Sequence, residues 1–267
     1  MTIAELNNQG IYFEDSGGDE SPIMFMHGFL MDHEMFDPQV AVLTPRYRCV
    51  RFDARAFGKT QWDGQPFTLH DTAADCIGLM DHLKIPKATI IGMSQGGFAA
   101  LRLALKHPDR VKALVLIATQ AGTDGEEFNV GFRGMRDTWR EQGPIPDLLE
   151  GNARMILGPK EGKETGPLWE KWIPKWQNQT GEQIFHAVNN CADRDDITEQ
   201  MEQITIPALV IHGEADEGAP ISVGEALDKA LPNSKGLIRV PSASHAVNLS
   251  HPQAVNSSLV EFLNEYG

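Results

Sequence analysis

The sequence has few cysteines and no long apolar segment. Its three cysteines, Cys49, Cys76 and Cys191, are odd in number and lack metal-binding spacing, which indicates free thiols in a reducing compartment. The longest apolar runs, such as residues 113–118, are far shorter than the roughly 20 residues that a membrane helix needs. Residues 1–10 also lack the basic and apolar segments of a secretory signal. We therefore expect a cytoplasmic protein without a membrane partner.

The sequence is also short of positive charge. Lys and Arg total 23 against 37 Asp and Glu, so the formal net charge is −14. Nucleic acids and anionic membranes would repel such a protein, which argues against both as partners. Its 41% hydrophobic and 22% charged residues are ordinary for a globular protein. A chain of 267 residues suffices for one large domain, or for one domain with an insertion.

Strand-like and helix-like segments alternate along most of the chain. Such alternation predicts an α/β fold, with helices on both faces of a mostly parallel sheet. The apolar run at residues 110–120 is nearly continuous, as expected of a strand buried on both faces. Short apolar runs predict strands at 10–15, 22–28, 47–53, 87–94, 110–120, 206–213 and 235–240, and helical periodicity predicts helices at 68–83, 95–106, 222–231 and 252–263.

The alternation stops between about Gly122 and Gln203. This segment lacks strand-like runs and holds four of the five tryptophans, so we predict a helical insertion at 122–203 in a core formed by 1–121 and 204–267. Trp169, Trp172 and Trp176 share a helical face. They either anchor the insertion to the body, which apolar stripes usually do, or form an aromatic pocket wall. The run DRDD at 193–196 is interpreted as a solvated helix start.

A serine stands at the corner between a predicted strand and a predicted helix. Residues 92–96 read GMSQG and match G-x-S-x-G, with a strand before and a helix after. A strand that turns directly into a helix strains the corner residue, and this strain is tolerated when the neighbours are glycines. Ser94 could instead only cap the helix. The strand–turn–helix context favours Ser94 as a nucleophile.

A serine hydroxyl needs a base to remove its proton, and the chain offers nine histidines. His245 lies in the loop between the last predicted strand and the last helix, at the same sheet edge as Ser94. His212 lies inside a late strand, which favours a core histidine bonded to the backbone. We therefore expect His245 to be the base.

The loop after the strand at 206–213 offers three acids, Glu214, Asp216 and Glu217. Asp216 lies past the strand end, where it can orient an imidazole. The resulting order, Ser94, Asp216 and His245, is the order that G-x-S-x-G hydrolases use. A loop that follows the strand at 22–28 can supply the backbone N–H of Phe29, which together with the N–H of Gln95 would form an oxyanion hole.

These motifs together resemble the α/β-hydrolase superfamily across essentially the full chain. The segments HGFLMDHEMFDPQ, FDARAFGKT, GMSQGG, GEADEGAP and SASHAVNLSHPQAVN fall where that family has its oxyanion loop, the loop after strand four, the nucleophile elbow, the acid loop and the histidine loop. The resemblance implies an eight-stranded, mostly parallel sheet flanked by helices, with a helical cap after strand six. One departure is Ala56, where relatives usually have glycine.

The triad and the resemblance lead to a functional expectation. We expect a serine hydrolase of the carboxylesterase or lactonase type, which cleaves an ester or lactone of a small apolar substrate through an acyl-enzyme, without cofactor or metal. Two alternatives remain: a carbon–carbon bond hydrolase with the same triad, acting on a vinylogous diketone, and a triad-bearing small-molecule receptor with slow turnover. The expected pocket residues are Leu30, Met93, Trp169 and Val247. The sequence leaves the oligomeric state open.

Overall fold

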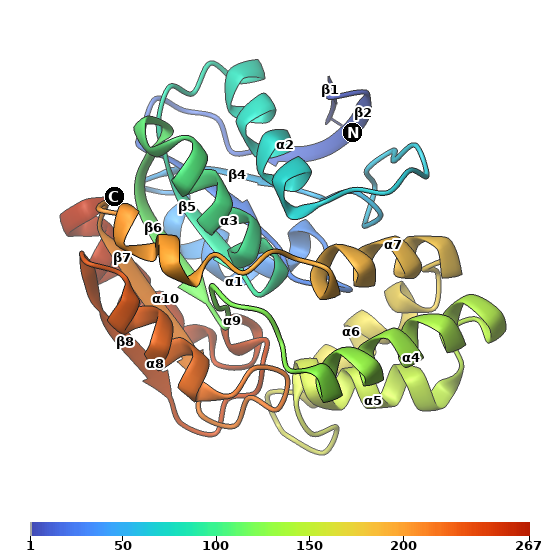
Figure 1. The fold of residues 1–267 in the computed structure, drawn as a ribbon. Helices are drawn as coiled ribbons and strands as arrows, with labels where there is room; N and C mark the ends of the chain where they lie inside the picture. Colours follow the sequence, from blue (N-terminus) through green and yellow to red (C-terminus); the bar gives the residue numbers. More distant parts are fainter. Residues whose placement is uncertain (1) are drawn as a thin grey trace.

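The computed structural model describes residues 2–267, and these residues form one eight-stranded sheet (Figure 1). The strand order is β1-β2-β4-β3-β5-β6-β7-β8. Strand β2 is antiparallel to its neighbours β1 and β4, whereas all pairs from β4 to β8 are parallel. The predicted mostly parallel sheet is therefore confirmed. The strands are β1 Thr2–Leu6, β2 Gln9–Asp15, β3 Pro22–Met26, β4 Arg48–Phe52, β5 Ala88–Met93, β6 Val111–Ile117, β7 Ala208–Gly213 and β8 Ser234–Val240.

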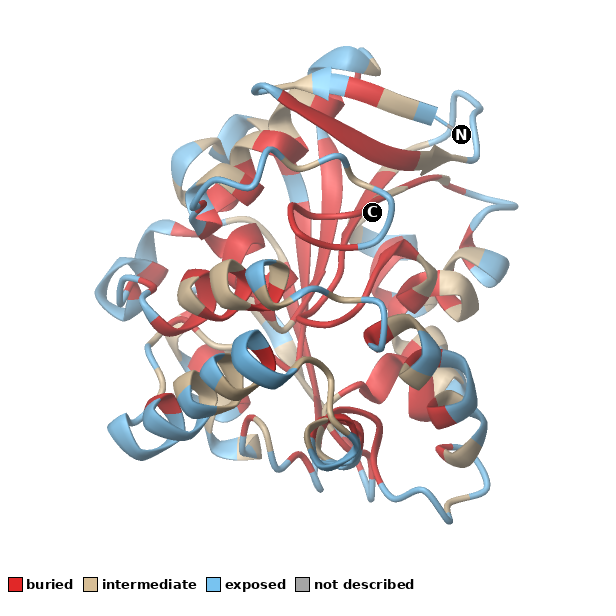
Figure 2. Ribbon diagram, turned by 90° about the vertical axis from the view of Figure 1, so that its right-hand side faces the viewer, coloured by how far each residue is buried: buried red, intermediate tan, exposed pale blue. Residues whose placement is uncertain are grey.

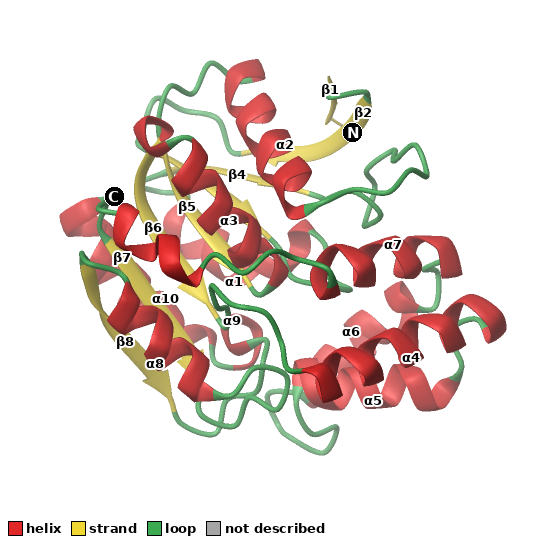
Figure 3. Cartoon of the chain, in the orientation of Figure 1, coloured by secondary structure: helices red, strands yellow, loops and turns green. Residues whose placement is uncertain are grey.

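Helices cover both faces of this sheet, as Figure 3 shows. One face packs against α2, α3 and α8, and the other packs against α1 and α10. Short 3-10 helices and α9 complete the connections. The bounds are η1 His33–Phe36, α1 Asp37–Leu43, α2 Leu69–His82, α3 Gln95–Lys106, η2 Pro108–Arg110, η3 Thr198–Gln203, α8 Ile221–Ala230, α9 Val247–Ser250 and α10 Pro252–Tyr266.

The central strands are apolar throughout because both of their faces are covered. In β6, Leu114 and Leu116 face the α2–α3 side, while Val115 and Ile117 face the α1–α10 side. Figure 2 shows the result: buried segments run through the middle of the sheet, and exposed stretches lie on the outer surfaces of the helices. The nearly continuous apolar run predicted this burial correctly.

Four helices lie between β6 and β7, to one side of the sheet (Figure 1): α4 Glu126–Gln142, α5 Pro146–Leu157, α6 Gly166–Trp176 and α7 Gly181–Ala192. Trp139, Trp169, Trp172 and Trp176 are buried in the same hydrophobic cluster as Ile117 of the sheet. Their burial supports the anchoring role for the tryptophans. The division of the chain into a core and a cap at 122–203 stays a prediction.

The structure adds elements that the sequence pattern did not predict. Strand β1 lies at the sheet edge and buries only Ala4, so its apolar pattern is weak. Helix α1 is only seven residues long and starts with Pro38 in its first turn.

Ala56, where relatives were expected to have glycine, has a φ of 69°, a left-handed conformation that favours glycine. Among residues 2–267, no helix combines the length and apolar character that a bilayer crossing requires.

Candidate active site

Ser94 occupies the corner between β5 and α3 in a strained backbone conformation. Its φ is 50° and its ψ is −116°, values that only a tightly packed surrounding maintains. Its backbone N–H donates to the carbonyl oxygen of Ile117 at 2.9 Å, which fixes the corner against β6. A Cβ on Gly92 would lie 2.6 Å from the Gly96 oxygen, and one on Gly96 would overlap the Met26 carbonyl. The flanking glycines are therefore required by close backbone approach.

The Ser94 hydroxyl points toward His245 and makes no capping hydrogen bond to α3. It lies 2.9 Å from Nε2 of His245, which follows β8 in the loop before α9. Nδ1 of the same ring lies 2.7 Å from Oδ2 of Asp216, in the loop after β7. The structure thus brings together the three side chains that the sequence singled out, in one hydrogen-bonded chain.

The surroundings of Asp216 keep it ionised. Its side chain is fully buried, and its Oδ1 accepts hydrogen bonds from the N–H groups of Gly218 (2.9 Å) and Ala219 (2.8 Å). Burial alone would raise the pKa of Asp216. The neighbouring His245, with hydrogen bonds from His212, His245 and Ala219, more than offsets burial and lowers this pKa below its usual range. Asp216 is therefore a fixed negative charge beside the imidazole.

This carboxylate also sets the basicity of His245. Burial lowers the pKa of the imidazole, but the charge of Asp216 and its hydrogen bond to Nδ1 outweigh that effect, so the pKa of His245 is raised above its ordinary value. A raised pKa makes His245 a stronger base toward the Ser94 hydroxyl. The geometry and the electrostatics agree on the direction of proton transfer.

A second histidine contacts the acid. His212 is completely buried in β7, with Nε2 2.7 Å from the Ala219 carbonyl oxygen, so its predicted role as a backbone-bonded core histidine is confirmed. Because a carbonyl can only accept, this nitrogen carries the proton. The same nitrogen lies 3.3 Å from Oδ2 of Asp216. Sequence reasoning missed this contact, although the four-residue separation of His212 and Asp216 across a strand end was a usable signal.

Two backbone N–H groups near Ser94 are available to a ligand. Neither the N–H of Phe29 nor that of Gln95 has a hydrogen-bond partner within residues 2–267. The Phe29 loop lies close to the serine, since a Cβ on Gly28 would be 3.5 Å from Cβ of Ser94. Gln95 is the first residue of α3, where helix N–H groups point outward.

A cavity of about 60 Å³ opens next to Ser94 and His245. Its walls are mainly apolar and rich in methionine, a flexible side chain that adapts to irregular ligands. Met93, one of the expected pocket residues, is part of the wall. The apolar wall residues include Phe29, Met31, Met35, Met93, Phe98, Phe128, Phe132, Met155 and Ile156.

The other three expected pocket residues do not line this cavity, and the structure corrects these predictions. Leu30 and Val247 are buried in the hydrophobic core and are not among the residues that line the cavity. Trp169 is also buried, and its indole N–H donates to the carbonyl oxygen of Gly158 at 2.9 Å, which ties α6 to the end of α5. The tryptophans therefore hold helices together and do not form an aromatic wall of this cavity.

One corner of the cavity is polar, formed by Gln120 and Asp124. Asp124 accepts hydrogen bonds from Gln120 Nε2 (2.6 Å) and from Nη1 of Arg194 (2.7 Å). Residues 193–196 follow the end of α7 and do not start a helix, and Arg194 is buried, so the interpretation of DRDD is wrong on these two points; the three aspartates are exposed as expected. The pairing was invisible in the sequence because Asp124 and Arg194 are far apart in the chain.

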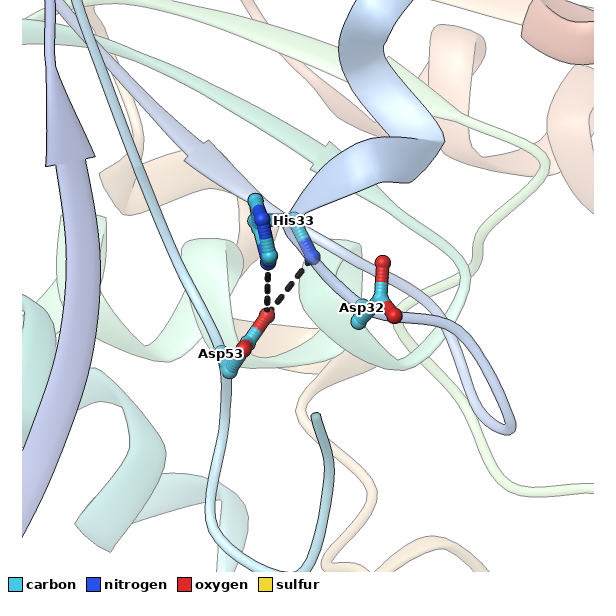
Figure 4. A group of neighbouring side chains, drawn as sticks. All are labelled: Asp32, His33 and Asp53. Atoms are coloured by element: carbon cyan, nitrogen blue, oxygen red, sulfur yellow. Dashed lines mark hydrogen bonds and ion pairs between the residues drawn. The ribbon is translucent and has the colours of Figure 1, made fainter. Parts of the chain in front are cut away.

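Figure 4 shows a second polar cluster, formed by Asp32, His33 and Asp53. Three of their donor atoms lie close enough to hold a cation, but each already has a protein partner. Oδ1 of Asp53 accepts from the backbone N–H and Nδ1 of His33, both at 2.7 Å. Its Oδ2 accepts from the Lys59 N–H, and Asp32 accepts from the Glu34 N–H and the Lys175 ammonium. We therefore assign this cluster the structural role of joining two loops.

The order of the strands and the hydrogen-bonded chain Ser94–His245–Asp216 at the corner between β5 and α3 are those of an α/β hydrolase. The model of the family described as alpha/beta hydrolase fold matches residues 21–252, and the chain belongs to this family. The superfamily resemblance seen in the sequence is thereby confirmed.

Individual relatives carry several activities. The chain is 27% identical to 3-oxoadipate enol-lactonase 2 of Acinetobacter baylyi, covering 93% of this chain and 90% of that protein. It is 28% identical to a non-heme haloperoxidase of Rhodococcus erythropolis, covering 95% of each. A thermophilic esterase from Thermogutta terrifontis superposes with a TM-score of 0.89 at 27% identity, covering 97% of this chain and 94% of that structure. The family and these relatives support an enzyme of the hydrolase class.

Proposed function

We propose that this protein is a serine hydrolase that cleaves a carboxylic ester or lactone of a small apolar substrate through an acyl-enzyme. The observation that carries the proposal is the hydrogen-bonded chain from Ser94 through His245 to Asp216. An alcohol, an imidazole and a buried carboxylate in this order are the parts that acyl transfer to serine requires.

In the first step, Oγ of Ser94 attacks the carbonyl carbon of the substrate while Nε2 of His245, 2.9 Å away, takes the hydroxyl proton. Asp216 holds Nδ1–H of the ring at 2.7 Å and stabilises the imidazolium that forms. The negative charge that develops on the carbonyl oxygen is stabilised by the N–H groups of Phe29 and Gln95, whose lack of internal partners supports this role.

The tetrahedral intermediate then collapses: His245 donates the proton to the leaving alcohol oxygen, and the bond between the carbonyl carbon and that oxygen breaks. The acyl group is then bonded to Ser94. In the second half of the reaction, water enters, His245 removes one of its protons, and the water oxygen attacks the carbonyl carbon. His245 then returns this proton to Oγ of Ser94 as the carbon–Oγ bond breaks, which releases the acid. No step draws on a group beyond this chain, the substrate and water.

The cavity and the relatives support this substrate class. A small, mainly apolar cavity with methionine walls favours an apolar substrate over a highly charged one. The names of the relatives, an enol-lactonase and an esterase among them, agree with ester-type chemistry. We also propose that residues 122–203 form a cap, because α4 and α5 supply Phe128, Phe132 and Met155 to the cavity wall.

Replacement of Ser94 tests the proposal. Ser94→Ala should lower kcat for p-nitrophenyl butyrate by a factor on the order of 10⁶, because it removes the nucleophile. Ser257→Ala, an exposed serine on α10, provides the control and should leave the rate unchanged. Ester turnover by Ser94→Ala at near the wild-type rate, with the fold intact by circular dichroism, would contradict the assignment.

The same assay separates the alternatives. An esterase turns over p-nitrophenyl acetate repeatedly, whereas a receptor with slow turnover releases about one equivalent of nitrophenol and stops. A carbon–carbon hydrolase would prefer a vinylogous diketone to any ester when the two kcat/KM values are compared.

A further inference from the structure

A second hollow lies between α4 and α5, beside the catalytic cavity. It has a volume of about 340 Å³, and its apolar walls include Phe128, Phe132 and Met135 from α4 and Leu148 and Met155 from α5. In the molecule, α4 packs mainly against α7 and α5 packs against α6, which leaves the space between α4 and α5 open. We call this hollow the α4–α5 groove.

The α4–α5 groove adjoins the catalytic cavity. Phe128, Phe132 and Met155 line both spaces. Phe132 packs edge-on against the ring of Phe29 at a centroid distance of 5.1 Å, so the shared wall adjoins the loop that carries the proposed oxyanion N–H. The catalytic cavity holds only about 60 Å³, against about 340 Å³ in the groove. A substrate chain that is too long for the cavity needs further apolar space, and the groove lies directly across the shared side chains.

Two glycines keep the groove open. Gly131 of α4 and Gly151 of α5 line it from opposite sides, and a Cβ at either position would have no atom within 4 Å. Glycine inside a helix costs about 0.5–1 kcal/mol relative to alanine, so these positions are not optimised for helix stability. A larger residue at either position would project into the groove and fill part of it.

Charges at the groove indicate what it binds. Glu127 and Asp147 lie on its rim, both exposed, and neither has a cationic partner within residues 2–267. Asp124 lies on the wall of the adjoining cavity. An anionic tail would be repelled by these carboxylates, whereas an uncharged hydrocarbon chain would bury apolar surface against the phenylalanines and methionines.

We propose that the α4–α5 groove binds the acyl chain of a neutral ester longer than the catalytic cavity can hold. This inference rests on the proposed ester hydrolysis and names its substrate class. The acyl side is part of this proposal: the carbonyl would lie next to Phe29, whose ring packs against Phe132 on the groove wall, and the experiment below distinguishes acyl length from alcohol length. The groove thus selects acyl length and leaves the chemistry at Ser94 unchanged.

Filling the groove from its two glycines tests the proposal. Gly131→Leu and Gly151→Leu should each lower kcat/KM for p-nitrophenyl octanoate by about tenfold, the loss expected when roughly two methylene groups are kept out of an apolar site. Both variants should hydrolyse p-nitrophenyl acetate within about twofold of wild type, because the acetyl group ends inside the cavity. Gly134→Leu, on α4 but outside the groove and equally uncrowded, is the matched control and should leave both substrates unchanged.

Several results would overturn the groove assignment. Equal losses for acetate and octanoate, no loss for octanoate, or a loss confined to acetate esters of long alcohols would each exclude acyl binding in the groove. These results leave the proposed function intact, since acetate turnover reports on Ser94 alone. Titration calorimetry of methyl octanoate into Ser94→Ala needs no turnover. Binding should be detected there and should be about tenfold weaker in Ser94→Ala/Gly131→Leu, and equal binding to both would contradict the proposal.

Discussion

Glycines at the two ends of the substrate site have opposite surroundings. At the corner next to Ser94, Gly92, Gly96 and Gly97 are crowded, and a Cβ on any of them would collide with neighbouring atoms. In the α4–α5 groove, Gly131 and Gly151 have open space around them. The corner at Ser94 is thus fixed by close packing, whereas the groove has room for larger side chains. If the two proposals hold, chemistry and substrate choice are separable in this molecule.

The largest effect should come from removing the negative charge of Asp216 beside His245. Asp216→Asn should lower kcat by about 10⁴, because an amide cannot hold His245 in the tautomer that accepts the Ser94 proton. Steady-state kinetics with p-nitrophenyl butyrate gives the ratio. Asp109→Asn, an exposed acid in η2, is the control. A loss below about tenfold would assign the acid role elsewhere.

Adding one methyl group at the corner should be costly. In Gly96→Ala, the new Cβ overlaps the Met26 carbonyl, which belongs to the rigid end of β3. We expect a loss of about 2–3 kcal/mol in the free energy of unfolding, measured by urea denaturation, together with loss of ester turnover. A variant with wild-type stability and activity would show that this corner can relax.

The pH profile should report on the coupling between the acid and the base. His245 must be neutral to accept a proton, and Asp216 raises its pKa despite burial. The rate should therefore fall as the pH drops through a value above the ordinary histidine pKa of about 6.5. In Asp216→Asn this limb should move to lower pH. Profiles of kcat/KM from about pH 5 to pH 9 test both statements, and a wild-type limb below the ordinary value would contradict the first.

The smallest effect should be a gain in stability on α4, at a position outside the groove. Gly134→Ala, in the middle of α4 with no atom near the added Cβ, should raise the free energy of unfolding by about 0.5–1 kcal/mol. Activity toward short and long esters should stay the same. Urea denaturation beside Gly96→Ala gives the contrast directly, because the same substitution should change stability in opposite directions at the two sites.

Local pattern was sufficient to predict the central sheet and the corner. The strands β3 to β8 carry apolar runs that are long enough to recognise, and α3 begins and ends where its periodicity predicted. Ser94, Asp216 and His245 each follow the end of a parallel strand. Because parallel strands end at the same edge of the sheet, their proximity could be predicted from the sequence. Edge strand β1 and short α1 bury too little to leave a readable pattern.

The pocket was predicted poorly because it depends on how distant helices pack. Trp169 shares a helical face with other tryptophans, but whether that face meets a ligand or the body is decided by tertiary contacts. Phe128, Phe132 and Met155 belong to two helices whose relative position has no local signature. Asp124 and Arg194 meet across the whole of the α4–α7 segment. Such long-range pairings need coordinates.

The most direct test of the central claim is to identify the residue that a fluorophosphonate labels. Attack by Ser94 Oγ on phosphorus would expel fluoride and leave a phosphonylated serine. This product is stable because water does not release it as it releases the acyl group of an acyl-enzyme. Peptide mass spectrometry should find a single modification, on Ser94, and none in Asp216→Asn over the same short exposure. Rapid labelling of a different residue, or no labelling of a folded wild-type protein, would contradict the account.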